Sequence, residues 1–221
     1  MQSVRFRIER SVIKLASHHF FRKKKELKFN EFNLSAELLA EIEKAGFVEA
    51  SPIQEQTIPL ALEGKDVIGQ AQTGTGKTAA FGLPTLEKID VNNTVIQALV
   101  IAPTRELAVQ SQEELFRFGR SKGVKVRSVY GGSSIEKQIK ALKSGAHIVV
   151  GTPGRFARLI KRKALKLDHI ETLIWMKQMK CSIWASWKIS KPSLAVFRKH
   201  AKPCSFQQRC QKPSNALVFS L

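Results

Sequence analysis

The sequence predicts an α/β fold in which a parallel β-sheet carries helices on both faces. Across the middle of the 221-residue chain, short apolar segments alternate with longer segments of helical periodicity. Such alternation is typical of right-handed βαβ units. The apolar content of 43% is that of a globular protein. No apolar run approaches the length needed to cross a bilayer, so we expect no membrane association.

The expected elements follow one another in a regular order. The first helix follows a capping sequence, with Asn33 or Ser35 before an amphipathic stretch that reaches Ala45. Beyond it, apolar runs predict strands at 66–71, 98–102, 124–130, 147–151 and 172–174. Helices fit between them at 77–88, 105–120, 134–143 and 156–163.

The net charge of +19 is distributed unevenly along the chain. Residues 1–27 hold eight Lys and Arg and two acidic residues, residues 28–173 have a net charge of only +4, and residues 174–221 hold nine basic residues and no acidic one. This shift predicts one ordinary domain, residues 28–174, between a basic extension at 1–27 and a basic tail at 175–221, both irregular. The three cysteines all lie in the tail without zinc-type spacing, which favours a reducing, cytoplasmic location.

A glycine-rich segment between the first strand and the next helix has the features of a phosphate-binding loop. Gly74 and Gly76 allow backbone amides to turn inward around a phosphate, and the start of the helix adds its positive dipole end. Lys77 would reach the β- and γ-phosphates of a nucleotide, and the hydroxyl of Thr78 would bind Mg²⁺. Ala71 stands where the usual pattern has glycine, and the alternative is a glycine-rich turn that binds no nucleotide. The candidate residues are Ala71, Gln72, Thr73, Gly74, Thr75, Gly76, Lys77 and Thr78.

Five motifs in order resemble those of the DEAD-box RNA helicases, with the bacterial members the nearest in pattern. The chain reads AQTGTGKT from Ala71, PTRELA from Pro103, GG from Gly131 and TPGR from Thr152, with GF and SPIQ upstream of them at 46–54. The resemblance covers residues 28–174. It implies the first RecA-like domain of an ATP-dependent helicase that separates short RNA duplexes.

The resemblance also implies roles for individual residues. Gln54 would read the adenine edge of ATP through its amide, and Phe29 would stack on the base. Three turns would hold one RNA strand by its phosphates, without reading its sequence. We expect a monomer that acts in the cytoplasm, with ATP and Mg²⁺ as cofactors and RNA as partner. The expected RNA contacts are Pro103, Thr104, Arg105, Gly132, Thr152, Pro153, Gly154 and Arg155.

The acidic motif that gives the family its name is absent from this chain. After the strand that ends at Ile174 the family has Leu-Asp-Glu-Ala-Asp, whereas this chain continues WMKQMKC and holds no acidic residue beyond Glu171. The Ser-Ala-Thr motif and the second RecA-like domain are not visible either. We therefore expect no ATP hydrolysis, and an incomplete sheet with a gap beside the phosphate-loop strand.

The tail is compatible with a change of reading frame directly after Ile174. Trp175 and Met176 have single codons, so they are written TGG ATG. Read one base earlier, the following codons permit Leu-Asp-Glu-Ala-Asp-Glu-Met-Leu-Asn-Met-Gly, and residues 203–211 permit Thr-Leu-Leu-Phe-Ser-Ala-Thr-Met-Pro. Because one shift restores both missing motifs in order, we interpret residues 175–221 as translated out of frame. The segment 1–27 is interpreted as translated upstream sequence; a targeting peptide or RNA-binding arm is the alternative.

Two other functions stay open at this point. A non-catalytic fragment would bind ATP or RNA without turnover. A purely electrostatic RNA-binding tail over 177–209 would bind any polyanion, with steep salt dependence.

Overall fold

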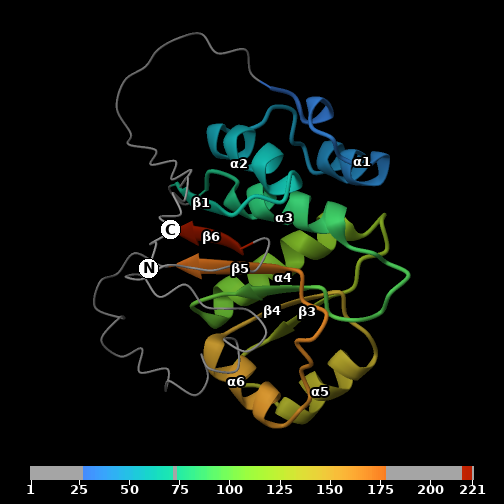
Figure 1. The fold of residues 1–221 in the computed structure, drawn as a ribbon, viewed down its shortest axis with the longest axis vertical. Helices are drawn as coiled ribbons and strands as arrows, with labels where there is room; N and C mark the ends of the chain where they lie inside the picture. The colour runs from blue at the N-terminus through green and yellow to red at the C-terminus, as the bar shows by residue number, and fades with distance from the viewer. Residues whose placement is uncertain (1–26, 72–73, 178–215, 221) are drawn as a thin grey trace, which may run out of the picture.

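The computed structural model describes residues 27–71, 74–177 and 216–220, which form an α/β domain around one six-stranded sheet (Figure 1). The helices are η1 (Phe29–Glu31), α1 (Ala36–Lys44), α2 (Pro52–Leu62), α3 (Lys77–Lys88), α4 (Arg105–Gly119), α5 (Ile135–Lys143) and α6 (Pro153–Lys161). The strands are β1 (Val67–Gln70), β2 (Ala98–Ile101), β3 (Val126–Val129), β4 (Ile148–Gly151), β5 (Thr172–Lys177) and β6 (Ala216–Ser220).

All pairings between neighbouring strands are parallel, and the strand order is β1-β6-β5-β2-β4-β3. Every residue of β2 and of β4 is buried, because helices cover both faces at the centre of the sheet. The predicted parallel α/β architecture is therefore confirmed.

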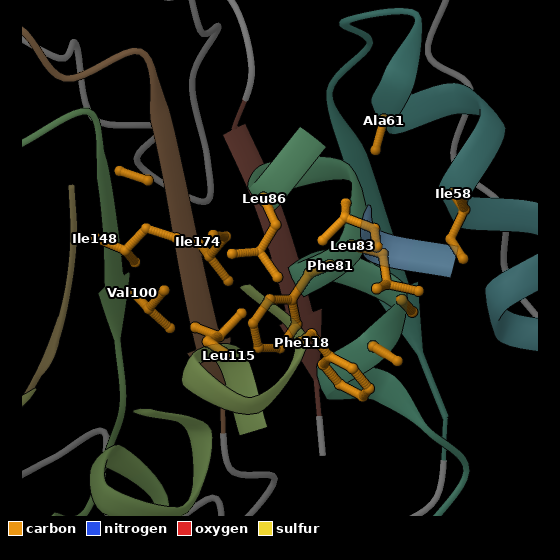
Figure 2. Packing of buried hydrophobic residues seen from close by; sticks show 14 of the residues in the cluster. Ile58, Ala61, Phe81, Leu83, Leu86, Val100, Leu115, Phe118, Ile148 and Ile174 are labelled. Carbon is orange, nitrogen blue, oxygen red and sulfur yellow. The ribbon is translucent and has the colours of Figure 1, made fainter. Parts of the chain in front are cut away.

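Alternate residues of each central strand enter two separate hydrophobic cores. Val100 and Ile174 pack with α3 and α4, where Phe81, Leu115 and Phe118 fill the space between helices and sheet (Figure 2). On the opposite face, Leu99, Ile101 and Val149 pack against Phe156 and Leu159 of α6. This two-sided burial fixes the register of the sheet, and with it the position of the loops that follow its strands.

The position beside β1 that we expected to be empty is occupied. Strand β6 pairs with β1 on one side and with β5 on the other, with Val218 opposite both Ile68 and Trp175. The expectation of a gap was wrong, because main-chain hydrogen bonding is independent of sequence and Ala-Leu-Val-Phe-Ser is apolar enough for an interior strand. Strand β5 also runs three residues beyond Ile174, into the segment that we assigned to the tail.

Candidate nucleotide and RNA sites

The phosphate-binding segment connects β1 to α3, as the sequence predicts. Gly74 and Gly76 both have φ near +80°, in the region that favours glycine, and Gly76 forms the N-cap of α3. Since glycine has no side chain to cap the helix, and no acidic residue lies in its first turn, this helix end suits an anion. Of the predicted residues, Gln72 and Thr73 lie outside the described part of the chain.

Lys77 lies folded back over this segment. Its ammonium donates to the carbonyl oxygen of Ala71 at 2.7 Å, and the residue is 7% exposed. Burial lowers the pKa of Lys77 from its ordinary value, because it disfavours the charged form. Thr78 follows in the first turn of α3 and is partly exposed. These groups fit a bound nucleotide: Lys77 would hold the outer phosphates, and Thr78 would supply an oxygen to the metal ion that accompanies them.

Gln54 is brought against the phosphate-binding segment rather than into open solvent. Its Oε1 accepts from the backbone N–H of Ser51 at 2.8 Å, and its Nε2 donates to the carbonyl of Gly76 at 3.1 Å. The hydroxyl of Ser51 donates to the carbonyl of Thr75 at 2.8 Å. With Gln54 only 1% exposed, its amide holds the loop in place. Its contact with adenine stays a prediction.

Phe29 belongs to the core in this conformation. It is 4% exposed and makes edge-on contacts with Phe32 and Phe47. The ring of Phe47 in turn contacts that of Phe118. The structure therefore gives the ring a packing role, and its stacking on a base stays a prediction.

The turn after β2 carries one exposed and one capping residue. Thr104 is the N-cap of α4, and its Oγ1 accepts from the backbone N–H of Leu107 at 3.3 Å. Arg105 is exposed, and its guanidinium carbon lies 4.8 Å from the ring centroid of Tyr130. Pro103 precedes both and is partly exposed.

The turns after β3 and β4 are bonded to each other. Gly132 has φ of +79°. Arg155 of α6 is 6% exposed and donates through Nη2 to the carbonyl of Ser133 at 2.9 Å. The structure therefore gives Arg155 a role in holding this loop, and its contact with an RNA phosphate stays a prediction. Thr152 is the N-cap of α6, followed by Pro153 at the first helical position and by the exposed Gly154.

Three residues to which the sequence analysis gave no role of their own organise these sites. Tyr130 lies under Arg105, Gln138 donates to the carbonyl of Tyr130 at 3.2 Å, and Ser51 bonds the phosphate loop. Of these, only Ser51 had a local signal, since Ser-x-x-Gln before a helix is a capping-box pattern.

The part of the chain that carries these segments is similar to known proteins. The model of the DEAD/DEAH box helicase family matches residues 51–175. The chain belongs to this family. The match includes the phosphate-binding segment and all three turns, and it ends one residue after Ile174.

Individual relatives match the same part of the chain. The DEAD-box ATP-dependent RNA helicase CshA of Streptococcus pneumoniae TIGR4 is 90% identical over 148 residues, which are 67% of this chain and 28% of that protein. The ATP-dependent RNA helicase CshA of Limosilactobacillus reuteri is 62% identical over 148 residues. The chain thus spans less than a third of the length of these helicases.

Solved structures of similar proteins share the fold. A DEAD box protein from Methanococcus jannaschii superposes with a TM-score of 0.70 at 37% identity, over 87% of this chain and 49% of that one. An ATP-dependent RNA helicase described as hypothetical, from Sulfolobus tokodaii, gives a TM-score of 0.68 at 30% identity, over 85% and 50% of the two chains. Within the described ranges of this chain, no helix is both long and apolar enough to cross a membrane.

Proposed function

We propose that residues 28–174 are a partial first RecA-like domain, binding ATP and RNA, of a cytoplasmic ATP-dependent RNA helicase. The observation that carries this proposal is the placement of four functional segments after β1, β2, β3 and β4, in a chain that matches the helicase family over 51–175. Parallel strands present their carboxyl ends at one edge of a sheet, where α/β proteins bind their ligands. RNA would be held there through its phosphates, independently of sequence.

ATP and Mg²⁺ are the cofactors that the phosphate loop fits. Lys77 would exchange the Ala71 carbonyl for phosphate oxygens, and Thr78 would bind the metal ion. An exchange of this kind favours nucleotide because the buried lysine is shielded from water and a phosphate oxygen carries the negative charge that a carbonyl oxygen lacks. Gln54 would read the adenine while its position stays tied to the same loop.

The chain as it stands would bind nucleotide without hydrolysing it. Hydrolysis needs carboxylates that organise Mg²⁺ and the attacking water, and the sequence contains none beyond Glu171. We assign this loss to a change of reading frame after Ile174, which the end of the family match at residue 175 supports. We expect the fragment to be a monomer.

Measurements of nucleotide binding and of ATP turnover test separately whether the chain binds ATP and whether it hydrolyses ATP. Calorimetric titration with Mg²⁺ and ATP is expected to show binding that Lys77→Ala abolishes and Gln54→Ala weakens. Lys65→Ala, which removes an exposed lysine paired only with Glu63 among the described residues, is the matched control and should bind normally. Phosphate release in the presence of RNA is expected not to exceed that of Lys77→Ala; turnover above this level would overturn the assignment of an inactive fragment.

The reading frame is tested at the DNA level. Sequencing across codon 174 should show ATT TGG ATG, and insertion of one T should restore Leu-Asp-Glu-Ala-Asp in the translated product. Codons that do not permit the shifted motifs would rule out the frame change, and the tail would then need an explanation of its own.

A further inference from the structure

The turns on the RNA side contain an aromatic side chain to which the proposed function gives no role. Tyr130 follows β3 directly, and its half-buried ring lies beneath the guanidinium of Arg105, 4.8 Å from the ring centroid. Arg105 is the first residue of α4 and is exposed. A guanidinium that lies over an aromatic ring is attracted to the ring face, while its N–H groups at the rim stay available for other acceptors.

The loop that carries Tyr130 is fixed from inside the protein at both ends. Gln138 of α5 donates to the carbonyl of Tyr130 at 3.2 Å, and Arg155 of α6 donates to the carbonyl of Ser133 at 2.9 Å. Both side chains are more than nine-tenths buried. Each keeps a second polar atom, Oε1 of Gln138 and Nη1 of Arg155, that has no partner among the described residues. Two helices thus hold the loop and set the position of the ring.

Gly132, between these two fixed points, lies next to Arg105. A Cβ on Gly132 would come within 3.5 Å of the Arg105 Nη1, so the guanidinium lies across the glycine turn as well as the ring. The exposed donors of Arg105 and the backbone of Gly132 are therefore neighbours. Both belong to the residues that we expect to contact RNA phosphates.

A long exposed arginine ordinarily samples many rotamers, and it loses this freedom when it binds a phosphate. A ring that holds the guanidinium beforehand removes part of that cost. Gln138 and Arg155 fix the loop that carries the ring, so these buried side chains also restrict the guanidinium of Arg105.

We propose that Tyr130 is a positioning residue for RNA, which acts through Arg105 by holding its guanidinium over the Gly132 turn. Arg155 and Gln138 support this arrangement from below, so Arg155 serves the RNA site without touching RNA. The proposal rests on the proposed function, since it concerns the same phosphate contacts.

The stacking itself is tested without RNA. Tyr130 is the only tyrosine of the chain, so incorporation of 3-fluorotyrosine gives a single ¹⁹F resonance from this ring. Arg105→Ala is expected to shift that resonance. Arg117→Ala, which removes an exposed arginine twelve positions along the same helix, is the matched control and should leave it unchanged. An unshifted resonance in Arg105→Ala would overturn the proposal.

The consequence for RNA is tested by titration with a fluorescent oligouridylate at several salt concentrations. Tyr130→Ala is expected to weaken binding about two- to fivefold, and Tyr130→Phe to bind like the unchanged chain. Arg105→Ala should lower the slope of log affinity against log salt by about 0.7, as for one lost phosphate contact on single-stranded RNA. The double variant Tyr130→Ala/Arg105→Ala should bind as Arg105→Ala does.

The outcomes distinguish failure of the proposed RNA function from failure of the positioning role of Tyr130. If the unchanged chain binds no oligouridylate, the proposed RNA function fails and this proposal fails with it. If it binds and Tyr130→Ala binds equally well, or if the effects of the two substitutions multiply, only the positioning role is overturned. Thermal unfolding and nucleotide titration of Tyr130→Ala exclude a general loss of structure. If Tyr130→Ala does not fold, the ¹⁹F measurement on Arg105→Ala still tests whether the ring and the guanidinium are stacked.

Discussion

The phosphate loop and the RNA-side turns follow parallel strands of one sheet, yet they are held in different ways. In the phosphate loop, the groups expected to contact ATP bond to the protein itself: Lys77 donates to Ala71 and Gln54 donates to Gly76. On the RNA side, Arg105 keeps its donors exposed and is positioned by a ring beneath it. The proposed nucleotide binding would therefore require exchange of existing hydrogen bonds, whereas the proposed RNA binding would start from a preformed arrangement.

The two sites also differ in what a substitution would disturb. Close approaches on the RNA side involve the backbone of paired strands, which cannot move without opening the sheet. Those at the phosphate loop involve side chains, which can turn away. Substitutions of glycine at each site measure this difference directly.

The largest effect is expected from Gly151→Ala, at the end of β4 on the RNA side. A Cβ there would overlap the carbonyl oxygen of Val129 in the paired strand, and it would lie 2.5 Å from the Val129 Cγ2 and 3.0 Å from the ring of Phe156. Because backbone has to shift, we expect a loss of about 3 kcal/mol in the free energy of unfolding, measured by urea denaturation.

Gly154→Ala, three residues further on, is the matched control for stability. A Cβ on Gly154 meets nothing within 4 Å, and the position is helical, so alanine should stabilise the chain by about 0.5 kcal/mol. Equal stability of the two variants would show that the β3–β4 contact is looser than the structure has it.

Gly76→Ala is expected to have the next largest effect, on nucleotide binding rather than on stability. The new Cβ would overlap Nε2 of Gln54 and lie 3.2 Å from its Cδ, so the Gln54 side chain has to leave its bond to the loop. With the additional strain of alanine at positive φ, we expect ATP affinity to fall roughly tenfold or more, as calorimetry would show.

Gly74→Ala distinguishes the effect of overlap with Gln54 from the effect of backbone strain at positive φ. Gly74 has the same positive φ, but a Cβ there meets nothing within 4 Å. It should cost less affinity than Gly76→Ala, and Gln54→Ala should partly rescue Gly76→Ala by removing the overlap. Equal losses in both glycine variants would mean that strain alone acts and that Gln54 does not hold the loop.

Much of this framework followed from local sequence, and the exceptions have physical causes. Helix α3 begins and ends where the sequence predicts, since glycine precedes it and its apolar residues recur at helical spacing. Helix α6 begins three residues early, because Pro153 favours the first helical position as much as it favours a turn. Helix α2 was not predicted: it contains Pro59 and has apolar residues on more than one side, although Ser51 and Gln54 form a capping box.

Sequence indicates the candidate residues of both sites, but it does not indicate their contacts within the protein. The phosphate loop and the three turns carry recognisable residue types, but the inward orientation of Arg155 depends on the carbonyl of Ser133, 22 positions away. Likewise, the stacking of Tyr130 on Arg105 depends on the strands that precede them, β3 and β2, which both pair with β4. Such contacts follow from the assembled sheet and leave no trace in local sequence.

Thr104→Ala tests whether the first RNA-side turn is held by its own helix cap. Its Oγ1 accepts from the N–H of Leu107 at the start of α4, so the substitution should cost about 1 kcal/mol of stability. Thr104→Ser keeps the acceptor and should retain most of that stability in thermal unfolding. A loss in both variants would assign the effect to the methyl group instead of the cap.

The smallest effect is expected from His147, which precedes β4 at the opposite edge of the sheet from Gly151. Its Nδ1 accepts from the backbone N–H of Lys125 at 3.1 Å, and the side chain is fully enclosed. Burial, followed by repulsion from Lys125, lowers the pKa of His147, and attraction from Asp90 opposes this only in part.

A histidine whose pKa is lower in the folded than in the unfolded chain stabilises the fold least in acid. Its stabilising contribution is fully present above the unfolded pKa of about 6.5 and is lost as the pH falls from there toward the folded pKa. The unchanged chain should therefore lose more stability between pH 7 and pH 5 than His147→Asn, whose side-chain oxygen can accept the same bond without titrating. Because His147 lies far along β4 from both sites, ATP and oligouridylate affinities at pH 7 should be equal in the two chains. Equal acid sensitivity would assign the loss to other groups, and a change in RNA affinity alone would show that the RNA-side turns depend on the far end of their strands.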